Sequence, residues 1–213
     1  NLKLYIGNRL SYAEEEILTV QASDAKPENF AELSVVMIEN PEPSRRVCVH
    51  LPDEAFIRGK VPMTKEEIRT LSLASLMLTR DAVLYDVGAG TGSVSVEAAL
   101  QAPGIRVYAV EKKAEGIELI LANKKKFMTD NLEVIHGVAP QVLEGLEIPT
   151  HVFIGGSSGN LKEIVKLLIE KNPQVRIVIN CITLETVSEA LETAKEFGFE
   201  ENEIVQLSAA RSK

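Results

Sequence analysis

A short apolar run followed by three glycines at alternate positions constrains the fold of this chain more than any other feature. The run Val83–Val87 is typical of a buried parallel strand. Gly88, Gly90 and Gly92 follow it, and positions 93–100 have a helical pattern. Glycine adopts backbone angles that other residues avoid and lets a ligand approach the main chain. Because the first N–H groups of a helix favour an anionic or polar ligand end, the stretch predicts a nucleotide-binding junction.

The spacing of the glycines separates two classes of cofactor. A dinucleotide site has the pattern G-x-G-x-x-G, and Ser93 stands where its third glycine would be. This disfavours the alternative of a nicotinamide-dependent dehydrogenase. The pattern D-x-G-x-G-x-G, which begins at Asp86 and includes Ala89 and Thr91, resembles motif I of the class I methyltransferases, which bind S-adenosylmethionine.

An acid at the end of the next strand is the second signal. Positions 106–110 form that apolar strand, and Glu111 ends it, 23 residues beyond Gly88. An acid about 20 residues after the glycine turn binds the ribose hydroxyls in folds of this kind. The alternative interpretation is a glycine turn and a solvated acid in some other α/β protein.

Composition excludes several classes of function. Acids outnumber bases 31 to 23, for a net charge of -8, which argues against a nucleic-acid partner. Cys48 and Cys181 lie far apart and form no zinc motif with the three histidines, so we expect no metal and free thiols in a reducing compartment. No apolar run approaches the roughly 18 residues of a membrane span. The chain begins at Asn1 without a signal peptide, so we expect a cytoplasmic protein and a piece of something longer.

The first 43 residues differ in pattern from the rest. We expect strands at 2–6 and 33–38 and a helix over 11–20, before two prolines at 41 and 43 break the chain. This segment is too short to bury a core by itself, so we expect it to pack on another part of the protein or on another subunit.

Strands and helices alternate from position 64 onward. The run T-K-E-E at 64–67 predicts a capping box, in which Thr64 caps a helix and Glu67 reaches back. Further helices are expected at 114–127, 161–170 and 183–197, with strands at 132–136, 151–154, 175–180 and 204–207. This order predicts a doubly wound parallel sheet. Ligands then gather at the carboxyl ends of the strands, at positions 88–92, 111, 137–139, 155–158 and 180–183.

Three further blocks specify a family. The runs P-D-E-A-F at 52–56, P-M-T-K-E-E-I-R at 62–69 and I-G-G-S-S-G at 154–159 resemble the precorrin carbon-15 methyltransferases and decarboxylases of cobalamin biosynthesis. The resemblance runs from about position 49 to 210. Residues 1–43 resemble the tail of the carbon-5 tetrapyrrole methylase that many bacteria fuse to this domain. The resemblance implies a methyltransferase domain over 44–213, with a class I Rossmann-like sheet whose last strand is missing.

The resemblance also implies roles for particular residues. Thr64 and the glycine turn match the part that holds the methionine end of S-adenosylmethionine, Glu111 matches the ribose acid, and Ala139 lies beside the adenine. The family has G-D-A where this chain has G-V-A, so an acid for the adenine amine is missing and a backbone carbonyl could serve. The expected cofactor-binding residues are Thr64, Asp86, Gly88, Ala89, Gly90, Thr91, Gly92, Glu111, Val138, Ala139 and Gly155.

The expected substrate is a tetrapyrrole with many carboxylates, which is methylated at carbon-15 and loses the carboxyl of its ring C acetate. We expect Arg58, Lys60, Gly156, Ser157 and Thr183 to bind it, with Arg45 and Lys65 as further cations; a solvated basic stretch is the alternative. The sequence identifies no general acid or base. The conjugated macrocycle can act as the electron sink for decarboxylation. The substrate can be cobalt-bound or metal-free. The resemblance suggests a homo-oligomer, a tetramer. The alternatives are a methyltransferase for RNA or another small metabolite, and a non-catalytic S-adenosylmethionine-binding module.

Overall fold

The computed structural model describes residues 2–41, 50–199 and 202–210. The chain divides into two compact units, residues 1–48 and residues 49–213. Among the described residues no helix is long and apolar enough to cross a bilayer.

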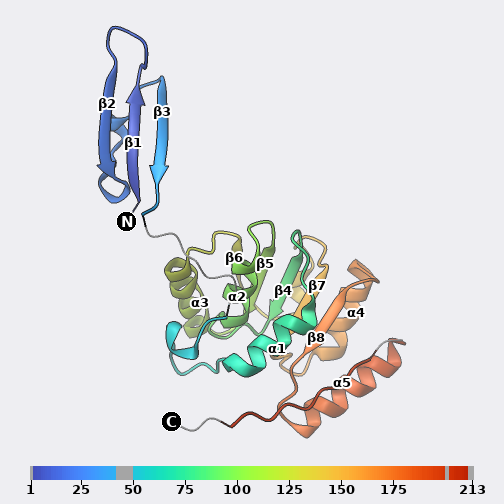
Figure 1. The fold of residues 1–213 in the computed structure, drawn as a ribbon. Helices are drawn as coiled ribbons and strands as arrows, with labels where there is room; N and C mark the ends of the chain where they lie inside the picture. The colour runs from blue at the N-terminus through green and yellow to red at the C-terminus, as the bar shows by residue number, and fades with distance from the viewer. Residues whose placement is uncertain (1, 42–49, 200–201, 211–213) are drawn as a thin grey trace. The chain divides into compact units, whose positions relative to one another are not determined.

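The first unit is a three-stranded antiparallel sheet (Figure 1). Its central strand β1 (Lys3–Asn8) lies between β2 (Glu16–Gln21) and β3 (Ser34–Glu39), and Ile6 stands opposite Leu18 and Val36. The two strands predicted at 2–6 and 33–38 are confirmed. The helix predicted over 11–20 is wrong, because residues 16–21 form a strand whose backbone pairs with β1, and the acidic run lies largely in the turn before it.

The core of this first unit is small. Leu4 and Ile6 are buried, but Val35, Met37 and Ile38 on β3 are each more than half exposed. A sheet that leaves this much apolar surface in water is short of packing partners. The expectation that the segment packs on something further remains a prediction.

The second unit contains a five-stranded parallel sheet of order β6-β5-β4-β7-β8 (Figure 1). Its strands are β4 (Val83–Val87), β5 (Arg106–Glu111), β6 (Leu132–His136), β7 (His151–Ile154) and β8 (Arg176–Ile179). The chain winds from β4 outward to β6, then returns to the other side of β4 for β7 and β8. The strand order therefore reverses beside β4, and ligands of doubly wound sheets bind at this switch point.

Helices cover both faces of the parallel sheet (Figure 1). On one face α1 (Glu66–Leu76), α2 (Ser93–Gln101) and α3 (Ala114–Phe127) pack on strand residues such as Leu84 and Val107. On the other face α4 (Leu161–Lys171) and α5 (Leu184–Glu196) pack near Tyr85 and Val152. Apolar side chains on both faces of each central strand explain the continuous apolar runs of the sequence. The predicted doubly wound arrangement is confirmed.

Two local predictions for this unit are wrong. Helix α1 begins at Glu66 after Lys65, and no side chain caps it, so the capping box of Thr64 and Glu67 does not form. The reason is the helix start, because Lys65 and not Thr64 precedes the first helical residue, which makes Glu67 the second residue of the helix rather than the third that a capping box requires.

The strand predicted at 204–207 is also absent. Residues 202–210 have no regular secondary structure, and Ile204 and Val205 are 72% and 55% exposed. A β-strand is stable only when its N–H and C=O groups pair with a neighbour. Among the described residues no strand pairs with this segment.

Candidate functional site

A pocket opens where the strands of the parallel sheet end, around the end of β4. It is bounded by the residues that follow β4, β5, β6 and β7 and by two residues that precede α1. The lining residues are Val61, Pro62, Val87, Gly88, Gly90, Val110, Glu111, Lys112, Lys113, Gly137, Val138, Ala139, Gly155, Gly156, Ser157 and Ser158. Four of the five predicted carboxyl-end stretches therefore meet in one pocket.

The glycine turn after β4 forms the floor of this pocket. The N–H groups of Gly88 and Ala89 both donate to the carbonyl of Val110, at 2.9 and 3.0 Å. Gly88 has a φ of +77°, and a Cβ there would stand 2.7 Å from the carbonyl oxygen of Gly156. Gly90 has a φ of +58°, and its Cβ would stand 2.7 Å from the carbonyl oxygen of Pro62. Both positions therefore require glycine, because the backbone that follows β7 and the backbone before α1 lie against the turn.

Glu111 connects the end of β5 to the glycine turn. Its Oε2 accepts the N–H of Gly90 at 2.9 Å, and its Oε1 accepts the N–H groups of Lys112 and Lys113 at 2.9 and 2.8 Å. The side chain is mostly buried, with 6% of the residue exposed, and it lines the pocket. A carboxylate held by three backbone donors is fixed in position and still has lone pairs to offer a ligand hydroxyl.

Asp86 lies beneath the turn and does not line the pocket. It is 1% exposed and accepts a short hydrogen bond from the hydroxyl of Ser95 at the start of α2. The pKa of this carboxyl is raised to about 7, chiefly by burial and in a smaller part by the nearby Glu111, while the bonds from Ser95 oppose the shift. Its Oδ1 and the hydroxyl of Thr91 are buried and have no partner among the described residues. Such orphaned atoms are rare and suit the polar end of a bound ligand or a water beside it.

The ends of β6 and β7 form the remaining walls. Val138 is 42% exposed, whereas Ala139 is buried and its carbonyl accepts the side-chain amide of Asn160 at 3.1 Å. Gly155 donates to the carbonyl of Val87 at 2.9 Å, which keeps its backbone against β4. A Cβ on Gly156 would meet nothing within 4 Å. Gly156 therefore leaves open space in the pocket rather than relieving a clash.

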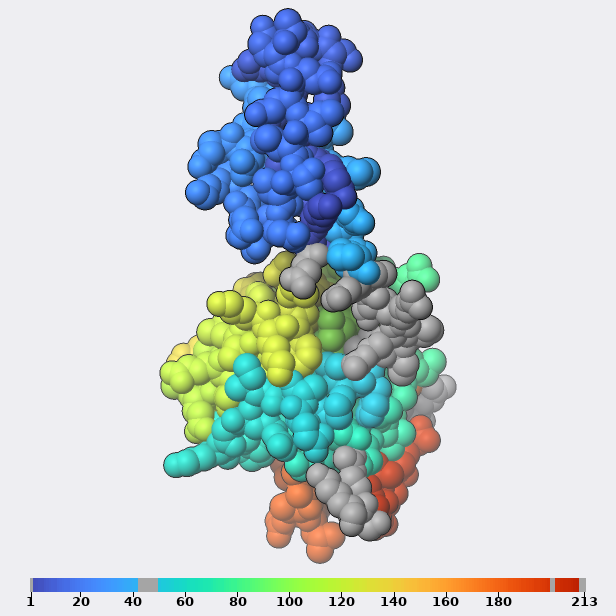
Figure 2. Space-filling view, turned by 60° about the vertical axis from the view of Figure 1, so that its left-hand side comes forward, coloured from blue at the N-terminus to red at the C-terminus, as the bar shows by residue number. Residues whose placement is uncertain are grey.

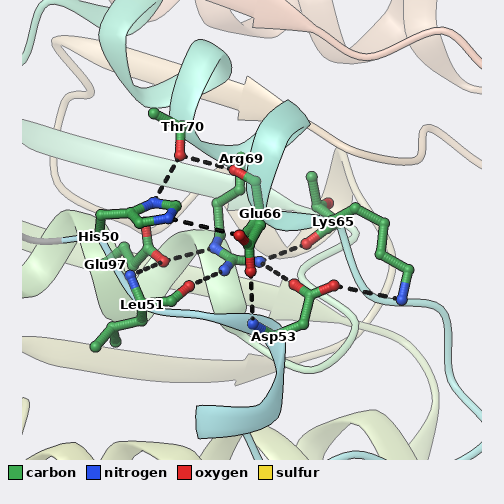
Figure 3. Close-up of polar contacts among 9 residues, drawn as sticks. His50, Leu51, Asp53, Lys65, Glu66, Arg69, Thr70 and Glu97 are labelled. Carbon is green, nitrogen blue, oxygen red and sulfur yellow. Dashed lines mark hydrogen bonds and ion pairs between the residues drawn. The ribbon is translucent and has the colours of Figure 1, made fainter. Parts of the chain in front are cut away.

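Residues 50–65 contribute Val61 and Pro62 to the pocket lining, and a buried arginine holds this segment in place. Arg69 on α1 is fully buried and donates to Glu97 on α2 at 2.7 Å and to Asp53 at 3.2 Å (Figure 3). It also donates to the carbonyls of Leu51 and Thr64, both at 2.6 Å. This network ties the segment to two helices and so holds Val61 and Pro62 in the pocket lining.

Aromatic contacts and one hydrogen bond to α3 also hold this segment in place. Phe56 packs on Phe127 with ring centroids 5.2 Å apart, and the Arg69 guanidinium lies 4.8 Å from the centroid of the Phe56 ring. At the far end of the segment, the N–H of Lys60 donates to Glu115 of α3 at 2.7 Å. Figure 2 shows the cyan surface of this segment lying against the yellow-green surface of α3.

The Arg69 network was missed from the sequence. The one signal is Glu97, which lies between Val96 and Ala98 in the largely apolar helix α2, whereas Arg69 has polar neighbours along α1. Charges are almost never fully buried unless they are paired, so Glu97 could have predicted a partner. Their spacing of 28 residues gave no indication of which partner it would be.

Several residues predicted to bind ligands do not line the pocket. Thr64 is half-buried and offers its carbonyl to Arg69, while Arg58 and Lys60 are exposed on the segment that packs against α3. Thr183 caps α5, accepting the N–H of Thr186 at 3.3 Å. Lys65 pairs with Asp53 at 3.4 Å.

Two other predictions concern cations and metals. Arg45 lies outside the described residues. Lys112 and Lys113, which the sequence interpretation did not single out, do line the pocket. Among the described residues no group of three or more acidic, histidine or cysteine side chains could hold a metal ion.

Comparison with known proteins identifies the family of the second unit. The family model described as "Precorrin methyltransferase domain" matches residues 54–213. The protein named "Probable cobalt-precorrin-6B C(15)-methyltransferase (decarboxylating)" from Pyrobaculum calidifontis is 42% identical over 166 residues, which are 76% of this chain and 85% of that protein. The Salmonella typhimurium cobalt-precorrin-6B C(15)-methyltransferase (decarboxylating) is 40% identical over 159 residues, 74% and 82% of the two chains.

Solved structures agree with this assignment. The precorrin-6Y C5,15-methyltransferase of Geobacter metallireducens has a TM-score of 0.67 and 37% identity, over 70% of this chain and 80% of that one. The precorrin 8W decarboxylase of Methanobacterium thermoautotrophicum has a TM-score of 0.66 and 34% identity, over 70% and 82%. A ribosomal protein L11 methylase at 13% identity and a TM-score of 0.58 shares the fold alone. The fold is that of the class I methyltransferases, and the chain belongs to the precorrin methyltransferase domain family.

Proposed function

We infer that this chain transfers a methyl group from S-adenosylmethionine to carbon-15 of a precorrin or cobalt-precorrin and removes the carboxyl of the ring C acetate, in cobalamin biosynthesis. The inference depends chiefly on one observation. In a chain of this family, the glycine turn and Glu111 meet in one pocket at the switch point of the sheet. The printed names of the relatives supply the reaction.

The residues present fit the cofactor. The hydroxyls of a ribose can reach the remaining lone pairs of Glu111, and the exposed Val138 and buried Ala139 offer an apolar wall to an adenine. Asp86 Oδ1 and the hydroxyl of Thr91, which have no partner among the described residues, belong to the end of β4 and the glycine turn, where we place the methionine end. S-adenosylmethionine supplies an activated methyl group. The residues of this chain supply position, and their alignment of two reactants can lower a barrier by several kcal/mol, on the order of 7–11 in the best cases.

The open space at Gly156 supports a flat acceptor. A macrocycle needs a wall without side chains, and Gly155 and Gly156 provide one beside the glycine turn. When the acetate loses carbon dioxide, the electron pair left behind can delocalise into the conjugated macrocycle, and a proton then replaces the carboxyl group. No described side chain is assigned as the acid or base of this step.

Product analysis with a paired glycine test examines this function. The purified chain is incubated with S-adenosylmethionine and a cobalt-precorrin, and mass spectrometry follows the gain of one methyl group and the loss of carbon dioxide. Gly156→Val should lower kcat/KM by more than about tenfold, because the side chain fills the acceptor space. Gly145→Val is the matched control, since a Cβ there also meets nothing within 4 Å and Gly145 does not line the pocket.

The same experiment separates the alternatives. Binding of S-adenosylhomocysteine without conversion of any precorrin would indicate a non-catalytic module or a methyltransferase for RNA or another metabolite. Failure to bind S-adenosylhomocysteine at all would refute the cofactor assignment. Equal activity of Gly156→Val and Gly145→Val would show that the acceptor does not bind beside Gly156.

We also propose that residues 1–43 are the tail and linker of a carbon-5 tetrapyrrole methylase domain. The apolar side chains exposed on β3, among them Val35 and Met37, support a unit that needs more sheet or a cover. Among the described residues no further strand pairs with the outer edges of β2 and β3, and such edges favour association into a homo-oligomer, a tetramer in our proposal. Sedimentation of the full chain and of residues 49–213 tests the part of this unit in association, because loss of residues 1–48 should lower self-association. The same oligomeric state for the full chain and for residues 49–213 would contradict the proposal.

A further inference from the structure

Two lysines stand at the pocket immediately after Glu111, and one of them extends toward the other side of it. This inference rests on the proposed function. The backbone of Lys112 is fixed, since its N–H donates to Glu111 at 2.9 Å and its carbonyl accepts Nε2 of His136 at 3.2 Å. Its side chain therefore leaves from a defined point at the end of β5.

The ammonium group of Lys112 binds on the far side of β4. Its Nζ donates to the hydroxyl of Ser158 at 2.8 Å, and Ser158 belongs to the turn that follows β7. Because β5 and β7 flank β4 in the sheet, this contact bridges the mouth of the pocket above the glycine turn. Both residues line the pocket, so the bridge stands where reactants enter.

The present partner of this cation is neutral. No ion pair joins Lys112 to a carboxylate among the described residues, whereas Lys65 and Lys162 have carboxylates at 3.4 and 2.8 Å. The neighbouring Glu111 directs its two oxygens to backbone N–H groups. In a chain with a net charge of -8, a pocket-facing ammonium that bonds only a hydroxyl can gain by exchanging it for a carboxylate, because charge-assisted bonds are about twice as strong as neutral ones.

We propose that Lys112 binds a carboxylate of a reactant at the pocket mouth and releases Ser158 when it does so. Two reactants carry this group. One is the amino-acid end of S-adenosylmethionine, and the other is an acetate or propionate of the tetrapyrrole. The chemistry at Lys112 is the same for both, and the ligand series below distinguishes them.

The test replaces Lys112 with methionine, which keeps an apolar stem and removes the charge. Lys166→Met is the matched control, because Lys166 lies on α4 away from the pocket and its Glu170 pair, at 4.0 Å, is exposed. Calorimetry measures the binding of S-adenosylhomocysteine and of 5′-methylthioadenosine, which lacks the carboxylate. Steady-state assays measure KM and kcat for the cobalt-precorrin.

Each source gives its own pattern. If the cofactor supplies the carboxylate, Lys112→Met weakens S-adenosylhomocysteine about tenfold or more and leaves 5′-methylthioadenosine unchanged. If the tetrapyrrole supplies it, both nucleosides bind as in the parent, and KM rises about tenfold with kcat retained. Lys112→Arg should recover most of either loss, and raising the salt concentration should shrink the effect.

Other results overturn the inference. Equal weakening of both nucleosides would show that Lys112 acts on the nucleoside rather than on a carboxylate. Values within twofold of the Lys166→Met control in all three measurements would also refute it, while leaving the proposed function intact if the parent binds and turns over. A parent chain that binds no S-adenosylhomocysteine would instead refute the proposed function, and this inference with it.

Discussion

Replacing Arg69 with methionine should destabilise the second unit by about 3–5 kcal/mol, the usual cost of removing one partner from a buried ion pair. Methionine keeps an apolar stem but is shorter and uncharged, so the variant loses the guanidinium contact with Phe56 together with the polar network. The change leaves Glu97, with a side chain 1% exposed, holding a buried charge whose remaining bond among the described residues is to the N–H of Leu51 at 3.0 Å.

The geometry supports a value in the upper part of that range. Arg69 makes four hydrogen bonds between 2.6 and 3.2 Å, two to carboxylates and two to carbonyls. Removing it leaves all four acceptors without this donor, and a buried acceptor without a partner costs about 1–3 kcal/mol. Asp53 is compensated in part, because Lys65 remains 3.4 Å from it.

Denaturant unfolding, followed by circular dichroism, measures the loss. Arg106→Met is the control, because Arg106 also makes a two-point contact with a carboxylate, Glu147, but in an exposed pair with side chains 49% and 43% accessible. Exposed pairs contribute little. The double variant Arg69→Met with Glu97→Gln should recover part of the loss, since the stranded charge is removed with its partner.

A loss for Arg69→Met no larger than for Arg106→Met would refute the reasoning. The Arg69 network would then contribute no more to the free energy of unfolding than an exposed ion pair does. A second readout concerns the pocket, because the network holds the segment that contributes Val61 and Pro62. Under conditions where the variant remains folded, its affinity for S-adenosylhomocysteine should fall. An unchanged affinity would show that the network does not position the pocket lining.

Three further changes test the floor of the pocket. Glu111→Ala should weaken S-adenosylhomocysteine by about 1.5–3 kcal/mol, the scale of a hydrogen bond to a charged group, and equal affinity by calorimetry would make Glu111 a structural acid only. Asp86→Asn should flatten the pH dependence of stability. The folded pKa of Asp86, about 7, lies above the ordinary 3.8, so the parent is stabilised below pH 4 and loses on the order of 4 kcal/mol as the pH rises to 7, at about 1.4 kcal/mol per unit; parallel unfolding curves would contradict this. Gly90→Val should unfold the turn as well as block the ligand, because its Cβ would stand 2.7 Å from the Pro62 carbonyl, and a fully folded variant would contradict the geometry.

The parallel sheet was predictable because its signals are local. Short apolar runs between glycines and prolines predicted β4, β6 and β7 at the bounds observed, and helix α3 was also predicted residue for residue. The family motifs then placed the glycine turn and Glu111 at one rim. Their meeting follows from the rule that parallel strands end at the same edge.

The remaining contacts depend on partners distant in sequence. Arg69 contacts Glu97, which follows it by 28 residues, and the carbonyl of Leu51, which precedes it by 18. No local sequence pattern specifies either partner. The failed capping box has a local cause, because α1 begins one residue later than predicted, after Lys65. Pairing between distant residues also explains why β2 forms in place of the expected helix. The backbone of β2 pairs with β1, and a local propensity does not include the stability that this pairing adds.

The glycine turn carries a constraint that motif logic alone does not include. A glycine in such a motif is usually explained by the approach of a ligand, yet here Gly88 is closed by the backbone of Gly156 and Gly90 by that of Pro62. Glu111 adds a third tie through the N–H of Gly90. The floor of the pocket is therefore made of main chain drawn from three separate segments, and it cannot shift without moving all of them. A methyl transfer that depends on alignment needs such a floor, because small displacements of the reactants lower the rate steeply.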